Sequence, residues 1–430
     1  MDTSQTNLRF RPHRTRVPEA RLKPIEPRLM DLTGKISGRF SRFKSTSQLI
    51  FQRQLQKKLY KQSGDKYESF QQSHNSMNVT FNITRIGGQL GSVKFRLGRQ
   101  IVEPFSTAPW CDKPGAEKLI PLLRELRGDF FCAPFGAGPA WRGEAHPPHG
   151  ESANGTWKVH PSECGRLVAT LRTRVRAGKI TKIIEAREGE TNIYQTHLLE
   201  GFKGDMCLGH HAMLDFNRNG PGIISTSKIL LAQVLPVLFE NPVDGGYSSL
   251  KPGAWFRQLD KVPMADGGKT DLTHFPAREG FEDLVMIHHK DGNDFAWSAV
   301  VFPEKKFVWF SLKNPAHLAS TVLWHSNGGR HYAPWNGRHR GVLGVEDVTA
   351  YFHLGLGASL ADNPWKEKGV PTALALGRKK CTRIPYIMGV APLVDGFDSV
   401  RTIQRTSTGV RLTSVSGAQI DHAVDTTFIQ

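Results

Sequence analysis

Residues 78–97 read NVTFNITRIGGQLGSVKFRL, and with them the chain changes from a polar, basic segment to β-like runs. Apolar and polar side chains alternate in residues 79–83 and again in residues 93–97. A period of two residues is typical of a β-strand with one buried face, because successive side chains point to opposite sides. The stretch therefore predicts two consecutive strands.

Short runs of the same kind continue through the chain, separated by Gly, Pro and Asn. Convincing helical patterns are few, and we expect helices only over 117–127, over 345–354 and from about residue 358. No fixed-period repeat favours a propeller or a solenoid. We therefore predict an all-β protein, a large antiparallel β-sandwich with few short helices and a ligand on one concave face. The remaining expected strands are 166–176, 182–186, 193–199, 222–225, 284–288, 296–302, 307–312 and 321–325.

The charge of the chain is concentrated at its N-terminus. The 430 residues carry a net charge of +18, and residues 1–76 hold 16 Lys and Arg against 6 Asp and Glu, a net of +10. We expect 1–76 to be a basic, mostly disordered extension and 77–430 to be the β-sandwich domain. A solvated tail, or a true start at Met77, explains the extension more simply than polyanion binding does. Nucleic acid is not an expected partner except weakly through this arm.

Several classes of protein are excluded by what the sequence lacks. No apolar run approaches the roughly 18 to 20 residues of a membrane helix, and no secretory signal pattern opens the chain. Five widely separated cysteines with no CxxC pair indicate neither a disulfide framework nor a cysteine zinc site, which favours a reducing, cytoplasmic location. No P-loop, dinucleotide fingerprint or nucleophile elbow is present. The oligomeric state is left open.

Residues 127–136, RGDFFCAPFG, and 146–157, HPPHGESANGTW, form the first cluster of candidate site residues. Polar groups embedded among Gly, Pro and aromatic residues are typical of a shaped loop. His146 and His149 have an HxxH spacing, but the two prolines between them exclude a metal-binding helix there. We expect no metal and no cofactor. Taken alone, this cluster is explained better by a loop histidine bonded to a backbone carbonyl than by a functional site.

The second cluster is 208–214, LGHHAML. Adjacent histidines on a strand point to opposite faces, so only one of His210 and His211 can reach a shared pocket. An imidazole that titrates near neutral pH is a natural general acid. The sequence leaves open which histidine faces the pocket, and a purely structural histidine is the alternative.

The third cluster is 324–340, WHSNGGRHYAPWNGRHR, followed by 341–348, GVLGVEDV. Aromatic rings stack on the apolar faces of sugars while planar polar groups bond the hydroxyls, so this composition is typical of a sugar site. Asn327, Trp335 and Arg338 are the candidate binding residues. Glu346 follows an apolar run and is a candidate buried base. The alternatives are an acid at a helix N-terminus or the neighbouring Asp347.

Taken in order, these landmarks resemble the galactose mutarotase-like proteins, especially the aldose 1-epimerases, from about residue 78 to about residue 393. His149-Gly150 resembles the early His-Gly segment of that family. The GHH of residues 209–211 resembles its central histidine strand, and Gly344-Val345-Glu346 resembles its late glutamate.

The resemblance implies a function and a role for each landmark. An aldose 1-epimerase interconverts the anomers of a monosaccharide or sugar derivative without metal or cofactor. Glu346 would then be the base and His211 the acid, with His210 as the alternative acid or a substrate-binding residue. His149 would orient the substrate, and Arg127 would bind it. The usual Asn-Arg pair before the early histidine is missing, which leaves a non-catalytic carbohydrate-binding protein as the alternative.

Overall fold

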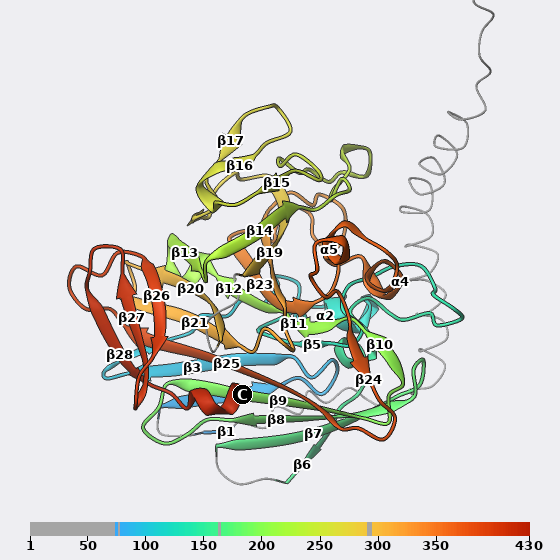
Figure 1. Cartoon of the computed structure of the whole chain (residues 1–430), viewed down its shortest axis with the longest axis horizontal. Coiled ribbons are helices and arrows are strands. Elements are labelled where there is room, and N and C mark those ends of the chain that lie inside the picture. The colour runs from blue at the N-terminus through green and yellow to red at the C-terminus, as the bar shows by residue number, and fades with distance from the viewer. Residues whose placement is uncertain (1–73, 76–77, 162–164, 290–294) are drawn as a thin grey trace, which may run out of the picture. The chain divides into compact units, whose positions relative to one another are not determined.

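The computed structural model describes residues 74–75, 78–161, 165–289 and 295–430, which all belong to one compact unit, Lys61–Gln430. Apart from residues 74 and 75, the predicted extension 1–76 lies outside the described residues. The compact unit is built on two large antiparallel sheets (Figure 1). The first has nine strands in the order β18 (His274–Phe275), β13 (Gly222–Thr226), β20 (Ala296–Phe302), β21 (Phe307–Lys313), β25 (Thr382–Pro392), β9 (Asn192–Glu200), β8 (Gly178–Glu185), β7 (Arg166–Thr173) and β6 (Lys158–His160).

The second sheet has eight strands and carries the candidate site. One strand, β12 (Ala212–Asp215), lies off the main path and pairs with β23. The main order is β15 (Trp255–Phe256), β14 (Ile229–Val234), β19 (Phe281–His289), β22 (Ser320–Asn327), β23 (Val342–Thr349), β11 (Leu208–His210) and β5 (Phe131–Cys132).

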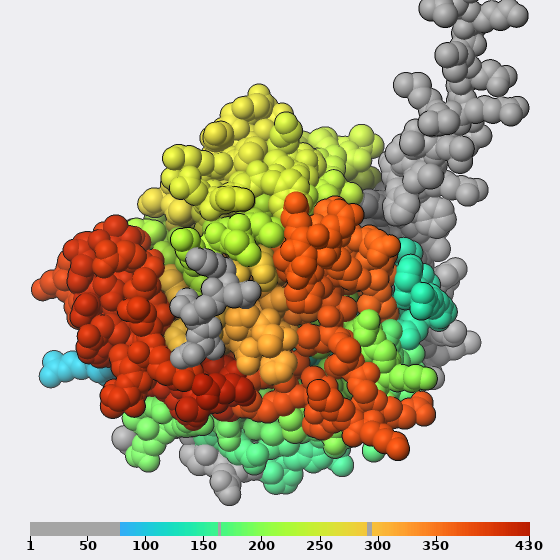
Figure 2. All heavy atoms as spheres, viewed as in Figure 1, coloured from blue at the N-terminus to red at the C-terminus, as the bar shows by residue number. Residues whose placement is uncertain are grey.

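Smaller sheets and short helices complete the unit. Strands β26 (Val400–Arg405), β27 (Gly409–Ser414) and β28 (Gln419–Ala423) form the red lobe at the left of Figures 1 and 2. Three further sheets are β1 (His74–Asn75), β2 (Val79–Ile83), β3 (Leu90–Leu97) and β4 (Gln100–Val102); β10 (Gly204–Met206) with β24 (Leu374–Leu376); and β16 (Val262–Pro263) with β17 (Lys269–Thr270). The helices are η1 (Ala116–Lys118), α2 (Pro121–Arg124), η2 (Glu151–Ala153), α3 (Phe216–Asn219), η3 (Pro242–Asp244), η4 (Leu259–Lys261), α4 (Gly355–Leu360), α5 (Pro364–Glu367) and η5 (Thr426–Ile429).

Three apolar clusters hold these layers together. The largest lies between the two sheets, where Leu323 and Val345 of the eight-stranded sheet join Trp309 of the nine-stranded sheet. A second covers the outer face of the eight-stranded sheet and includes α4, α5 and the strand residues Val322 and Val348. A third packs β26–β28 against the outer face of the nine-stranded sheet. The outer face of the nine-stranded sheet is thus covered at β20, β21 and β25, whereas β7 and β8 alternate buried with less buried residues.

The predicted all-β sandwich is confirmed, and the predicted strands lie within or closely match β7, β8, β9, β13 and β19–β22. Two helix predictions are wrong. Residues 117–127 contain only the short helices η1 and α2, and residues 345–354 begin inside strand β23. All eight residues of β23 are buried, so apolar and polar residues do not alternate along it. Its sequence therefore lacks the two-residue period that identifies a strand. The helix expected from about residue 358 is α4, which begins at Gly355.

Candidate active site

Strand β23 places its two adjacent acids on opposite faces of the eight-stranded sheet. Val345 contributes to the cluster between the sheets and Val348 to the cluster on the outer face. Glu346 shares its face with Val348, and Asp347 shares its face with Val345. Asp347 is paired between the sheets with Lys313 at 2.7 Å. The alternative that Glu346 is an acid at a helix N-terminus is therefore wrong, and Asp347 is separated from the outer face by the sheet itself.

The two adjacent histidines are divided between the same two faces. His210 ends β11 and lies between the sheets, where its Nδ1 is 2.9 Å from Asp129 Oδ2 and its ring stacks on Tyr386 at 4.1 Å. His211 lies on the outer face, and its Nε2 is 3.3 Å from Glu346 Oε1. The structure thus answers the question that the sequence left open. His211, and not His210, meets the glutamate.

Burial sets the protonation of the His211–Glu346 pair. Loss of hydration raises the pKa of Glu346 well above its ordinary value, and the nearby Arg330 opposes this only in part. Loss of hydration also holds the pKa of His211 well below its ordinary value, with His149 adding to the effect. Both shifts favour the uncharged forms, a protonated carboxyl group beside a neutral imidazole, over an ion pair. The pair holds one transferable proton.

Each member of the pair also keeps one polar atom without a hydrogen bond to the described residues. These atoms are Glu346 Oε2 and His211 Nδ1, and both are buried. Buried polar atoms normally have partners, so an unpaired oxygen and an unpaired nitrogen at one place are typical of a site that binds a polar ligand. Phe130 stacks on the His211 ring at 4.5 Å and holds its plane.

His149 is the third predicted residue at this site. Its ring centroid is 5.2 Å from that of His211, and its backbone is in the left-handed region with φ of 58°. The N–H of Gly136 donates to His149 Nδ1 at 3.4 Å, and Cys132 Sγ lies 3.3 Å from the same atom. Because Nδ1 accepts, the ring proton is carried by Nε2. Burial lowers the pKa of His149 to about 4, so the ring is a neutral donor.

An aromatic and acidic wall borders the pair on strands β19 and β22. Trp324 lies 5.7 Å from the His211 ring, and its Nε1 donates to Glu282 Oε2 at 2.9 Å. Ser326 donates to the other oxygen of Glu282 at 2.9 Å. Burial raises the pKa of Glu282 to about 7, although these hydrogen bonds and Arg330 oppose it. Glu282 thus fixes the orientation of Trp324.

Arg330 supplies the positive charge beside this wall. Its guanidinium lies 4.4 Å from the centroid of the Trp335 ring and 5.3 Å from that of Trp324. Its Nε donates to Glu240 Oε1 at 2.7 Å, and Tyr332 donates to the other oxygen of Glu240 at 3.0 Å. The predicted residue Trp335 is therefore part of the wall. The charge of Arg330 is largely balanced by Glu240.

Sequence reasoning did not place Glu240 or Glu282 at the site. Trp324 and Arg330 stand inside the third cluster, so their composition was a usable signal. Glu282 lies on β19 opposite Ser326 of β22, a pairing that no local pattern reveals. Glu240 lies in an irregular segment, and the sequence around it carries no signal that we could identify.

Three predicted binding residues are engaged elsewhere. Arg127 donates to Asp112 at 3.1 Å and to the carbonyl of Glu125. The side-chain amide of Asn327 donates from Nδ2 to the carbonyl oxygen of residue 277 at 3.0 Å and accepts at Oδ1 from the N–H of residue 341 at 3.1 Å. It therefore organises the loop after β22. Arg338 is exposed and donates to the carbonyl of residue 334.

Two further findings concern the part of the chain that the structure describes. None of its helices is long and apolar enough to cross a membrane. No group of three or more His, Cys, Asp or Glu side chains is arranged to hold a metal ion within the same residues.

The fold is similar to several solved structures. A candidate aldose 1-epimerase from Escherichia coli K12 is 11% identical, with a TM-score of 0.51 over 76% of this chain and 100% of that chain. A galactose mutarotase related enzyme from Lactobacillus acidophilus is 9% identical, with a TM-score of 0.51 over 76% and 99%. A galactose mutarotase-like protein from Clostridium acetobutylicum is 10% identical, with a TM-score of 0.50 over 76% and 99%. No protein-family model matches the sequence, and no curated protein matches it. The chain therefore has the galactose mutarotase-like fold, as its ordered landmarks predicted.

Proposed function

We propose that the protein is an aldose 1-epimerase-like enzyme that interconverts the anomers of a monosaccharide or sugar derivative. The observation that carries the proposal is the contact between His211 and Glu346, at 3.3 Å on the outer face of the eight-stranded sheet. The reaction needs one group that takes a proton and one that gives a proton. The basic segment 1–76 has no role in the proposal.

The chemistry follows from the single proton of the pair. The neutral pair has an ion-pair tautomer, Glu346 carboxylate with His211 imidazolium, that needs no proton from solvent. In that form Glu346 removes the proton of the anomeric hydroxyl, and the electron pair of that O–H bond forms the C1 carbonyl. The bond from C1 to the ring oxygen breaks, and the ring oxygen takes the proton of His211. Rotation about the C1–C2 bond and reversal of the transfers give the other anomer.

The groups around the pair have supporting roles in this proposal. His149 presents its Nε2–H as a fixed donor to a sugar oxygen. Trp324 and Trp335 are buried in the closed site, and they would present aromatic surface to the C–H face of the sugar ring once substrate opens it. Because His211 and Glu346 touch, substrate has to separate them on entry. The two atoms without partners in the described structure, Glu346 Oε2 and His211 Nδ1, gain hydrogen bonds when it does so.

A non-catalytic carbohydrate-binding protein on the same fold is the second candidate. The observation that favours it is again the contact between His211 and Glu346. Because the two side chains touch, there is no space between them for a sugar ring. If the pair stays closed, the aromatic wall alone would bind the ligand. Binding would then be independent of the charge on Glu346.

The test is the rate of mutarotation of freshly dissolved glucose and galactose, followed by polarimetry or NMR. We expect the full chain to accelerate it and Glu346→Gln to lose about 10²-fold or more, since general acid–base catalysis typically contributes about 10²–10⁴-fold. The matched control is Glu188→Gln, which removes an exposed carboxylate and should leave the rate unchanged.

Each outcome decides between the candidates. Undiminished acceleration by Glu346→Gln would refute the acid–base assignment. Saturable sugar binding without acceleration, equal in the parent chain and in Glu346→Gln, would establish the binding protein instead.

A further inference from the structure

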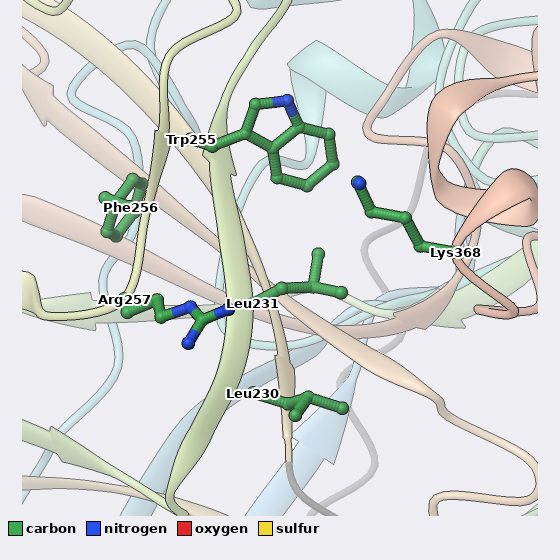
Figure 3. Close-up of a pocket in the computed structure, with 6 residues that line it drawn as sticks. All are labelled: Leu230, Leu231, Trp255, Phe256, Arg257 and Lys368. Atoms are coloured by element: carbon green, nitrogen blue, oxygen red, sulfur yellow. The ribbon is translucent and has the colours of Figure 1, made fainter.

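A hollow lies at the edge of the eight-stranded sheet, away from the His211–Glu346 pair. It has a volume of about 390 Å³ and is formed by β14, β15 and the end of α5 (Figure 3). Strand β14 is separated from β23 by β19 and β22. Three steps between neighbouring strands amount to about 14 Å. The lining residues are Leu230, Leu231, Trp255, Phe256, Arg257 and Lys368.

Trp255 provides a rigid aromatic surface in this hollow. Its side chain stays 39% exposed, although tryptophan is normally largely buried. It stacks on Trp365 with ring centroids 5.7 Å apart. Trp365 is fully buried, and its Nε1 donates to Gln233 Oε1 at 2.7 Å. The exposed ring is therefore held in place by a buried one, which lowers the entropy lost when a ligand stacks on it.

Two cations face the same hollow. Lys368 reaches toward Trp255 from the end of α5, with its Nζ 5.0 Å from the ring centroid (Figure 3). Arg257 comes directly after β15, the strand that contains Trp255, and its side chain is exposed. Within the described residues, neither cation forms an ion pair with a carboxylate. Two uncompensated positive charges in one hollow attract an anion.

Leu230 completes the wall and is 45% exposed, so the hollow combines apolar surface with positive charge. We propose that it is a second binding site, for a saccharide unit that carries a carboxylate, sulfate or phosphate group. The C–H face of such a ring packs on Trp255 and Leu230, while Lys368 and Arg257 bind the acidic group. The choice of a saccharide over another ring-bearing anion rests on the proposed function.

A single-stranded nucleic acid would also combine stacking with phosphate contacts. Its backbone, however, requires a positive groove that continues beyond one nucleotide. Here the hollow is lined by two cations, Arg257 and Lys368, and its other lining residues are apolar. These observations favour an acidic saccharide.

The experiment is titration of the full chain with trigalacturonic acid and with a heparin tetrasaccharide, followed by tryptophan fluorescence and calorimetry. Maltotriose is the neutral probe, and a ten-residue oligothymidylate is the nucleic-acid probe. We expect at least one acidic saccharide to bind more tightly than both. Trp255→Ala and Lys368→Gln should each raise its Kd about tenfold, from loss of stacking or of a charged contact.

Lys251→Gln is the matched control, because it removes an exposed lysine that does not line the hollow. It should leave the Kd unchanged, which separates a specific site from attraction by the net charge. Lys368→Gln alters only an exposed side chain, so it stays informative even if Trp255→Ala impairs folding. Glu346→Gln should leave the Kd of the acidic saccharide unchanged, and Trp255→Ala should leave the mutarotation rate unchanged. Failure of this proposal can therefore be distinguished from failure of the proposed function.

Three results would overturn the proposal. The first is no binding of either acidic saccharide. The second is binding weakened equally by Lys251→Gln and Lys368→Gln. The third is tighter, equally variant-sensitive binding of oligothymidylate, which would assign the hollow to nucleic acid.

Discussion

Glu346 and Asp347 are neighbours in sequence, and we expect their amide variants to behave in opposite ways. Asp347 lies between the sheets, where Lys313 is 2.7 Å away and Ser311, Thr321 and Tyr386 donate hydrogen bonds to it. Burial alone would raise the pKa of Asp347, but Lys313 and these donors hold it below its ordinary value. Asp347 is therefore ionised and paired in the folded protein.

Asp347→Asn removes one charge of this pair and leaves Lys313 buried without a counter-ion. Breaking a buried ion pair in this way costs about 3–5 kcal/mol, a large share of the roughly 5–15 kcal/mol that stabilises a typical domain. Glu346→Gln has the opposite expectation. Because burial favours the protonated form of Glu346, which an amide resembles in shape and lack of charge, the free energy of unfolding at pH 7 should fall by less than about 1 kcal/mol or should rise.

The assay is urea unfolding at pH 7, followed by tryptophan fluorescence and circular dichroism. The double variant Lys313→Met/Asp347→Leu is the control, since replacing both charges should recover most of the loss. The contribution of Asp347 is present above its unfolded pKa of about 3.9 and is lost as the pH falls through its lower folded value. Equal destabilisation by Asp347→Asn and Glu346→Gln would refute the assignment of the two acids to opposite faces.

Two further predictions concern the frame of the site. Burial raises the pKa of Glu282 from an ordinary 4.5 to about 7. Between these pH values the folded protein keeps a proton that the unfolded chain releases. The free energy of unfolding therefore falls as the pH rises through this interval. Glu282→Gln should flatten that fall, of the order of 3 kcal/mol, in unfolding curves taken from pH 4.5 to pH 7, and an unchanged slope would contradict the assignment. Gly128 has φ of 59°, and a Cβ there would lie 1.3 Å from the Leu90 carbonyl oxygen, so Gly128→Ala should cost more than about 3 kcal/mol. Gly143 has a φ of 84°, but a Cβ there would meet open space, so Gly143→Ala should cost only about 1 kcal/mol. Both variants are compared by thermal or urea unfolding. Equal costs would show that steric contact is not the cause.

The sequence predicted the strands best where one face of the strand is polar. Strands β3 and β7 alternate buried with less buried residues, so their period of two residues is visible locally. Strand β23 is buried on both faces, and its residues 345–349 were predicted as helix for that reason.

The candidate site was predicted in part. His149, His211 and Glu346 were identified as ordered landmarks, and the structure brings their side chains together. Arg127 was predicted as a binding residue from its motif, yet its guanidinium is engaged by Asp112. The motif indicates only that an arginine is present, whereas the direction of its guanidinium depends on the nearest carboxylate, here that of Asp112.

The sequence by itself determined the fold class and the residues from which an acid–base site could be built, because alternation and chemical type are properties of the local chain. The tertiary structure alone decided that His211 rather than His210 meets Glu346, and that Glu282 lies beside Trp324. Both facts depend on which strands pair and in which register. A shift of one residue would exchange the two faces, and that register is fixed by contacts between residues far apart in the sequence.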